Sequence, residues 1–240
     1  MLLVSTTLLA LIYLSFISLG LPDSVLGSAW PAMSIALRAP LWGAGLVQML
    51  ISFCTIISSL NSAKLIRKFG TGKLTAISVA TTAVALLGFS LAPNYVFLLL
   101  MAIPLGLGAG AVDAGLNNYV ALHCEAKHMS WLHCFWGVGT IVSPFVMSYA
   151  LTNSTWNNGY RTIALFQIVL TLILFFSLPL WQKPSADASA DETSVPEQRS
   201  FSRLIRVPGV KEVLTCFFCY CAVEQTTSLW ASSYLTLYKG

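Results

Sequence analysis

Gly108-Ala-Gly-Ala-Val-Asp113-Ala-Gly-Leu-Asn117 is the stretch that decides the fold, because it sets a carboxylate inside a hydrophobic segment long enough to cross a membrane. Two more acids, Asp23 and Glu224, lie in segments of the same kind, although the whole chain has only 9 acidic residues. A carboxylate in hydrocarbon costs about 3 kcal/mol on insertion scales, so an acid there is a functional-site hypothesis by default. The three acids fall in the first, fourth and seventh apolar segments. A period of three segments is the repeat unit of one large class of transporters.

The composition places the chain in a lipid bilayer. Its residues are 56% hydrophobic and only 9% charged, whereas soluble domains carry about 25% charged residues. The net charge of +4 does not indicate nucleic acid as a partner, because the basic residues are grouped in short loops between apolar stretches. The first stretch has no Lys or Arg before it and no small-residue cleavage pattern after it, so we interpret it as a retained membrane helix. The sequence thus predicts an all-α polytopic membrane protein.

Seven hydrophobic segments reach about 20 residues, the length that spans a bilayer. The polar run Gln182–Arg206 interrupts them once and has the composition of a flexible linker. We therefore predict a six-helix transmembrane bundle at 1–181, a cytoplasmic linker at 182–208, and at 209–240 a seventh transmembrane helix that begins a second bundle. The predicted helices cover residues 3–34, 41–64, 73–92, 94–122, 129–152, 160–181 and 210–238.

Lys and Arg residues set the predicted orientation, since they are enriched in cytoplasmic loops. Of the 13 in the chain, ten lie on one side of the predicted helices and three on the other. The N-terminus is therefore expected in the cytoplasm, in a cell membrane for which the bacterial inner membrane is the first expectation. A seven-helix receptor is disfavoured because its N-terminus lies outside, and a retinal pump because the seventh segment has no Lys in its interior. The basic residues of the cytoplasmic side are Lys64, Arg67, Lys68, Lys73, Lys127, Lys183, Arg199, Arg203, Arg206 and Lys211.

Four stretches resemble the major facilitator superfamily, and in particular its fucose-permease-like sugar transporters. The fourth segment matches a pattern of that group, Gly-x-Gly-x-x-acid-x-x-x-Asn, from Gly108 to Asn117. The other three resemble its first, fifth and seventh helices, and the resemblance as a whole extends over essentially the whole chain. They read Leu11-Ile-Tyr-Leu-Ser-Phe-Ile-Ser-Leu-Gly-Leu-Pro-Asp23, Trp131-Leu-His133-Cys-Phe-Trp-Gly137-Val-Gly139-Thr-Ile-Val-Ser-Pro144 and Tyr220-Cys-Ala-Val-Glu224-Gln-Thr-Thr-Ser-Leu-Trp230.

The resemblance implies a six-helix bundle of two inverted three-helix repeats, followed by a linker and a seventh helix. It also implies a secondary active transporter that works by alternating access about a midplane site, and that takes up a sugar or similar small polar solute with protons. One departure is Arg67, which stands where the superfamily usually carries an acid between helices two and three, so the gating ion pair of that acid is in doubt. Export of drugs or metabolites by the same scaffold, a non-transporting membrane receptor and an inactive fragment remain alternatives.

Six residues are predicted to form the transport site. Asp113 and Asn117 are four positions apart and share one helix face. Without a cationic partner, burial favours the protonated carboxyl group, so Asp113 is predicted to carry the coupled proton, while the Asn117 amide can bond either protonation state. Carboxylate and amide groups also suit sugar hydroxyls. The predicted substrate-binding residues, most of them implied by the resemblance, are Asp23, Asn117, Asn118, His133 and Glu224.

No other motif in the sequence indicates chemistry. Gly106, Gly108 and Gly110 superficially resemble a nucleotide-binding loop, but they lie within an apolar helix with no strand before them. Close helix packing is the better interpretation of these glycines. No nucleophile–base pair or established metal-ligand spacing stands out, so we predict no enzymatic activity, no cofactor and no metal site.

Overall fold

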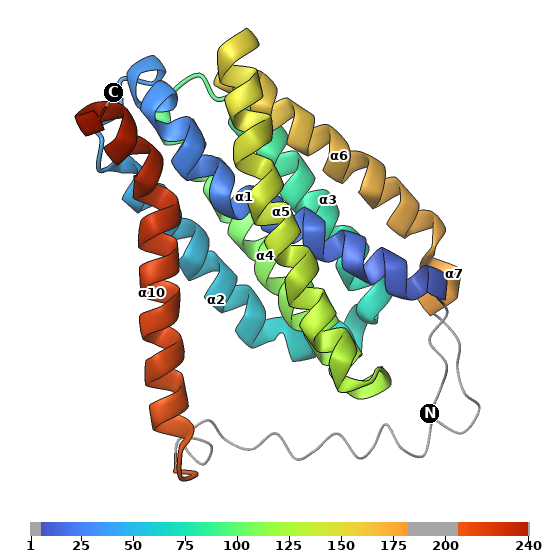
Figure 1. Cartoon of the computed structure of the whole chain (residues 1–240). Coiled ribbons are helices and arrows are strands. Elements are labelled where there is room, and N and C mark those ends of the chain that lie inside the picture. Colours follow the sequence, from blue (N-terminus) through green and yellow to red (C-terminus); the bar gives the residue numbers. More distant parts are fainter. Residues whose placement is uncertain (1–5, 182–205, 240) are drawn as a thin grey trace.

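The structure, a computed structural model, describes residues 6–181 and 206–239. Within these two ranges there are helices and turns but no strand, so the predicted all-α class is confirmed. The long helices run alongside one another, with α10 at one edge of the bundle and the short α7 at the end of α6 (Figure 1). The helices are α1 (Thr6–Ala36), α2 (Gly43–Phe69), α3 (Thr71–Ser90), α4 (Tyr95–His123), α5 (Ala126–Asn153), α6 (Trp156–Phe176), α7 (Leu178–Trp181), α10 (Val210–Tyr234) and the π-helical turn η2 (Leu235–Lys239).

The junction of α2 and α3 differs from the prediction. The predicted second helix ends at residue 64, but α2 continues for five more residues, and Gly70 alone separates it from α3. Lys64, Arg67 and Lys68 are good helix formers, and their positive charges suit the C-terminal end of a helix. Gly70 ends the helix with a φ of 74°, a left-handed conformation that glycine adopts without steric cost.

Helices α1 to α6 are long and apolar enough to cross a membrane, by length and composition. By the same measure α10 is not among them, because the run Glu224–Ser228 makes its second half polar. Its bounds nevertheless agree closely with the predicted seventh helix, and its crossing of a membrane stays a prediction. The sixth helix ends earlier than predicted, at Phe176, since Ser177 separates it from α7.

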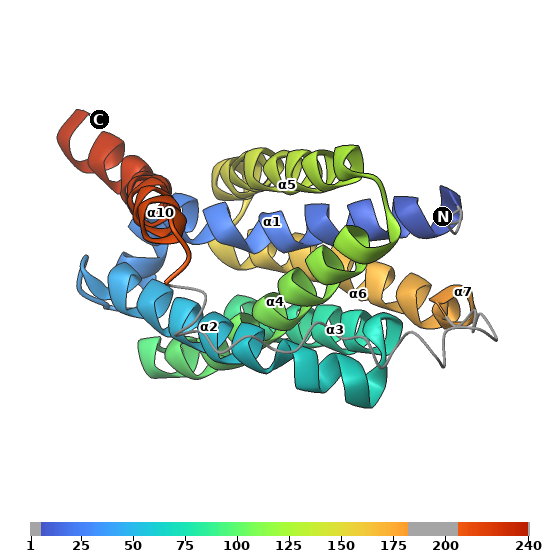
Figure 2. The same cartoon turned by 90° about the horizontal axis from the view of Figure 1, so that it is seen from below.

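The most extensive helix pairs are α1 with α5, α2 with α4, and α3 with both α4 and α6. Seen from below, α5 lies along α1 on one side of the bundle and α3 lies on the other side (Figure 2). If the first three helices are exchanged with the second three, the α1–α5 pair becomes the α4–α2 pair. The two pairs are therefore equivalent, as expected for two three-helix repeats.

Glycines allow both of these pairs to approach closely. A Cβ atom on Gly20 would overlap the backbone carbonyl of Trp136, and one on Gly139 would overlap a backbone carbonyl of α1. In the same way, Cβ atoms on Gly106 and Gly110 of α4 would overlap backbone carbonyls of α2. The close helix packing predicted for the glycines of α4 is confirmed, and it is the packing that small residues provide in membrane helices.

Two apolar clusters fill the bundle, one toward each end, and a polar layer separates them. The polar layer consists of Ser15, Ser18, Thr82 and Gln167, which are all at most 5% exposed. Its side chains come from α1, α3 and α6, at the level where each of these helices passes from one cluster to the other. One cluster includes Ile12, Phe16, Val79, Leu116, Leu132 and Leu174, and the other Trp30, Met33, Leu86, Phe89, Leu98 and Tyr160.

Candidate functional site

A small cavity opens beside the polar layer, where α1, α2, α3, α4 and α6 meet. It has a volume of about 20 Å³, measured to the centre of a water molecule, which is room for a water but not for a sugar. The cavity alone is therefore not a solute site in this conformation. Its polar lining is formed by Ser15, Ser18, Asp23, Gln48, Thr82 and Gln167.

Asp23 lies in the middle of α1, because that helix extends over Thr6–Ala36 and carries both Pro22 and Pro31 within it. A helix of this length places the acid in its interior and not at its outer edge. The half-buried Asp23 carboxylate accepts a hydrogen bond from the indole Nε1 of Trp136 on α5, with Nε1 and Oδ2 2.8 Å apart. This bond forms one helical turn from the glycine contacts of α1 and α5.

Asp113 and Asn117 form a second polar pair on α4. The Asn117 Nδ2 donates to the Asp113 carboxylate at 2.9 Å and also to the Asp113 backbone carbonyl at 3.0 Å. Both side chains are half-buried. The shared helix face predicted for these two residues is confirmed, and the amide is placed to donate to the carboxylate directly.

The charges of two of the predicted acids act on the third. The charges of Asp113 and Glu224 both act on Asp23, and the charge of His133 acts on Asp113. These groups come from four helices, α1, α4, α5 and α10.

Two of the predicted binding residues are less well placed. Asn118 is exposed, since it lies one position around α4 from Asn117, and it forms no hydrogen bond within the described part of the chain. His133 is also exposed, with its ring edge-on to Phe16 of α1 at 6.0 Å between centroids. Of the acids, only Asp113 is affected by the charge of His133. The structure thus places Asn118 and the His133 ring at exposed positions, although the charge of His133 acts on Asp113.

Several polar contacts of the site were not predicted from the sequence. Trp136 is one, although a buried indole usually needs an acceptor for its single N–H group. Gln48 of α2 is another, and its Nε2 donates to Oε1 of Gln225 on α10 at 3.2 Å. The third is Gln167, which accepts from Thr82 and donates to the Ser18 carbonyl. A glutamine within an apolar segment is the sequence signal that could have identified Gln48 and Gln167.

Helix α10 packs on the bundle through its second half only. Leu229 and Ser233 are buried, and a Cβ atom on Gly27 of α1 would overlap the backbone carbonyl of Ser228. In the first half of α10, every residue from 211 to 220 is exposed. Figure 1 shows this end of α10 standing away from the other helices. The two ends of the α1–α10 contact are thus unequal. The helices touch beside Gly27, next to an open pocket of about 400 Å³ between α1, α5 and α10, and they stand apart at the other end.

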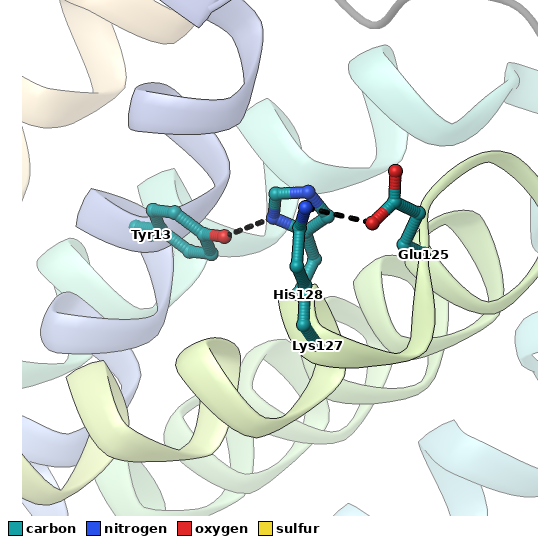
Figure 3. A network of polar contacts seen from close by, with 4 residues as sticks. All are labelled: Tyr13, Glu125, Lys127 and His128. Atoms are coloured by element: carbon teal, nitrogen blue, oxygen red, sulfur yellow. Dashed lines mark hydrogen bonds and ion pairs between the residues drawn. The ribbon is translucent and has the colours of Figure 1, made fainter.

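The end of the bundle where α4 joins α5 carries a polar network, shown in Figure 3. Tyr13 of α1 shares a hydrogen bond of 2.7 Å with Nδ1 of His128 on α5. Beside it, Lys127 Nζ lies 2.7 Å from Glu125 Oε2, and this contact lowers the pKa of Glu125. The ion pair is exposed to solvent and contributes little stability. The Tyr13–His128 bond instead links α1 to α5 at this end, as Asp23–Trp136 does near the middle.

The described ranges contain no cluster of acidic, histidine and cysteine side chains. Within 6–181 and 206–239, no group of three or more His, Cys, Asp and Glu residues is placed to hold a metal ion. The histidines and cysteines at the junction of α4 and α5 instead serve local contacts. His123, for example, stacks on Tyr119 with 4.4 Å between ring centroids and bonds the Tyr119 carbonyl at 2.9 Å.

Comparison with known proteins identifies the family. The chain is 23% identical over 201 residues to "Bypass of stop codon protein 6" of Saccharomyces cerevisiae, an alignment that covers 75% of this chain and 40% of that protein. It is 27% identical over 108 residues to the "Glucose/mannose transporter GlcP" of Bacillus subtilis, which covers 44% of this chain and 27% of that protein. The chain thus matches less than half the length of either relative. The family model of the Major Facilitator Superfamily matches residues 12–240, so this chain belongs to that superfamily of multi-pass membrane transporters.

Proposed function

We propose that this chain forms the first helix bundle of a secondary active transporter that takes up a small polar solute, in the first instance a sugar, with protons. Family membership supports transport. The name of the Bacillus subtilis relative supports a sugar, as does the resemblance of four stretches to fucose-permease-like transporters. Residues 182–208 are proposed as a cytoplasmic linker and 209–240 as the first helix of a second bundle, in a cell membrane with the N-terminus in the cytoplasm.

The observation that carries this proposal is that the charges of Asp113 on α4 and Glu224 on α10 both act on Asp23 of α1. Acids inside membrane-spanning segments usually mark a substrate or proton pathway. Two of these helices belong to the six-helix bundle, and the third lies beyond the linker. A solute held among them would contact both sides of a moving interface, as alternating access requires.

The groups around the acids suggest a division of roles. Asp113 has no Lys or Arg in the interior of its own helix, and the Asn117 amide beside it can bond either protonation state of the carboxyl group. We assign the coupled proton to Asp113 for this reason. Asp23 is held by Trp136 with its second oxygen available, so we assign solute hydroxyls to Asp23 and Asn117. Glu224 is the second candidate for the coupled proton. The exposed His133 and Asn118 would contact solute only at the edge of such a site.

The unequal packing of α10 supports alternating access. Helix α10 contacts α1 at the Gly27–Ser228 end and is exposed at the basic end of the bundle. This is the arrangement of a site that is closed to one side and open to the other. The basic end carries Lys64, Lys68, Lys127 and Lys211. With the basic end in the cytoplasm, as the positive-inside rule predicts, the conformation is open inward. A rocking motion that parts α10 from α1 at Gly27 would then expose the site outward.

The test separates solute exchange from proton-driven accumulation. The complete open reading frame that contains this sequence would be purified, reconstituted in liposomes and assayed with a panel of radiolabelled sugars. Asp113→Asn mimics the protonated form, so exchange should persist while accumulation against a gradient is lost. Asp23→Asn should instead raise the half-saturating solute concentration, since it weakens hydrogen bonding to the solute. The matched control is Asn153→Asp, a change of the same size on the exposed end of α5.

Three outcomes would contradict parts of the proposal. Accumulation that still responds to a proton gradient in Asp113→Asn removes the coupling role from Asp113 and passes it to Glu224. Exchange that is lost in both variants would show that the acids serve folding, which the thermal unfolding of each variant would reveal. Absence of exchange for every sugar, in a protein that exchanges another class of solute, would remove the sugar assignment but leave transport in place.

A further inference from the structure

The polar layer lies inside the helix bundle, where buried polar atoms are costly unless they have hydrogen-bond partners. It divides the two apolar clusters, and its four members are at most 5% exposed. Gln167 accounts for part of it, because its Oε1 accepts from Thr82 at 2.8 Å and its Nε2 donates to the Ser18 carbonyl at 2.7 Å. Such bonds between helices contribute roughly 0.6 kcal/mol each in membrane proteins. They explain why Gln167 and Thr82 are tolerated, but not why a cavity is left beside them.

Two oxygens at the cavity have no protein partner among the described residues. The Ser18 hydroxyl is one, although the residue is only 2% exposed and lines the cavity. The second is Oδ1 of Asp23, since the bond from Trp136 is made to Oδ2. Buried polar groups nearly always have a hydrogen-bond partner or a bound ion. The cavity between them is the place where such a partner would lie.

The charge around the cavity favours a cation as that partner. The cavity lining contains a single charged residue, Asp23, and no Lys, Arg or His. The other charges that act on Asp23 are negative, from Asp113 and Glu224. The uncharged lining supplies hydroxyl and amide oxygens, which together with a carboxylate are the ligands that hard cations prefer. A volume of about 20 Å³, measured to the centre of a water molecule, accepts one small ion and excludes a sugar.

We propose that this cavity is a sodium-ion site, formed by Asp23, the Ser18 hydroxyl and the amide oxygen of Gln167. The ion would neutralise Asp23 and fill the space between the two apolar clusters. The site is separate from the proton proposed at Asp113, but it shares the Asp23 carboxylate proposed to bind solute, so sodium and solute would occupy that carboxylate in different conformations. Because the ligands come from α1 and α6, with Gln167 tied to Thr82 of α3, sodium binding would hold three helices of the bundle together.

The test measures sodium binding without solute or transport. The full chain in detergent, buffered at constant pH and ionic strength, would be unfolded by heat in NaCl, KCl or choline chloride, and ²²Na⁺ binding would be measured at equilibrium. Sodium should raise the unfolding midpoint saturably, by about 2–4 °C near fivefold excess over the dissociation constant. KCl should raise the midpoint less than NaCl, because the smaller sodium ion approaches carboxylate and hydroxyl oxygens more closely and is attracted more strongly.

Two variants and one matched control decide whether the site is the one described. Asp23→Asn should abolish both ²²Na⁺ binding and the sodium-dependent rise, and Ser18→Ala should weaken binding about tenfold or more by removing a ligand. Ser143→Ala is the control, since Ser143 on α5 is fully buried with an unpartnered hydroxyl but does not line the cavity. It should bind sodium as the unchanged chain does.

Several results would overturn the sodium site. Equal saturable effects of NaCl and KCl would remove the assignment to sodium, and the absence of any saturable effect would mean that the cavity holds water only. Sodium binding that survives in Asp23→Asn and Ser18→Ala would place the ion elsewhere. If Asp23→Asn does not fold, the comparison of sodium binding by Ser18→Ala and by Ser143→Ala still decides whether the cavity is the site. A sodium site would stand even if every transport assay failed, and proton-coupled exchange in sodium-free buffer would stand even if no sodium bound.

Discussion

Trp136 on α5 donates its indole N–H to the Asp23 carboxylate on α1 across 2.8 Å, although the two residues are 113 positions apart in the chain. The bond is possible because Gly20 and Gly139 let the two helix backbones touch one turn away. One carboxylate oxygen is thereby fixed in direction, and the other stays free for a solute or an ion. Trp136 is therefore a positioning residue for the acid at the middle of α1.

Trp136→Phe should impair solute binding, because it removes the indole N–H group while keeping an aromatic ring at this position. A hydrogen bond to a charged group contributes about 1.5–3 kcal/mol, so the half-saturating solute concentration should rise about tenfold or more. The maximal exchange rate should change much less. Trp131→Phe is the matched control, because Trp131 lies on the same helix, is exposed and has no hydrogen-bond partner within the described residues. Equal kinetics for the two variants would show that Trp136 does not position Asp23.

Gly139→Ala should destabilise the protein, because its Cβ atom would overlap a backbone carbonyl of α1. Overpacking of this kind costs about 1–3 kcal/mol, which thermal unfolding in detergent should show as a midpoint lower by several degrees. Gly137→Ala is the control two positions away, where an added Cβ atom meets nothing within 4 Å. Alanine there should leave stability unchanged or raise it by up to about 1 kcal/mol, since it is the better helix former. A Gly139→Ala variant as stable as Gly137→Ala would mean that the α1–α5 contact is looser than described.

A disulfide between Ser24→Cys and Ser228→Cys should form readily and stop transport. Their hydroxyl oxygens are 3.5 Å apart, at the closed end of the α1–α10 contact. Oxidation should lock that end, and a thiol reductant should restore exchange. The variants would be made after replacing the six native cysteines, whose described side chains are all free.

Ser24→Cys with Thr215→Cys is the control for this cross-link. Thr215 lies in the exposed first half of α10, about 20 Å along the helix from Ser228, so this pair should not oxidise to a disulfide. Full transport by the oxidised Ser24→Cys/Ser228→Cys protein would show that parting of α1 and α10 is not needed for transport. The gate proposed at Gly27 would then be wrong.

The orientation can be mapped by cysteine labelling in intact cells with a reagent that does not cross the membrane. Lys68→Cys should be protected, because the basic end is expected in the cytoplasm, and Pro93→Cys should be labelled, since both residues are exposed in the structure. A reporter fused after Ser189, which lies outside the described residues, should report a cytoplasmic position. The reverse pattern would overturn the orientation and bring back the receptor alternative.

The sequence alone determined the class, the number of helices in the main bundle and the interior acids. Hydropathy and segment length are properties of neighbouring residues, so six spans and the α10 helix could be predicted to within a few residues. The pairing of Asp113 with Asn117 was predictable for the same reason, because positions four apart on one helix must meet. Local preference also explains the error at the α2–α3 junction, where good helix formers extended α2 through a stretch predicted to be a loop.

The tertiary structure decided which of these groups meet across helices. The bond from Trp136 to Asp23 and the one from Gln167 to Ser18 join residues 113 and 149 positions apart. Their geometry depends on how closely the helices approach, and glycines such as Gly20 and Gly139 set that distance only once both helices are in place. The cavity at the polar layer exists because five helices converge there. Hydropathy along one segment carries no information about such a convergence, since the energy of a buried polar group depends on partners supplied by other helices.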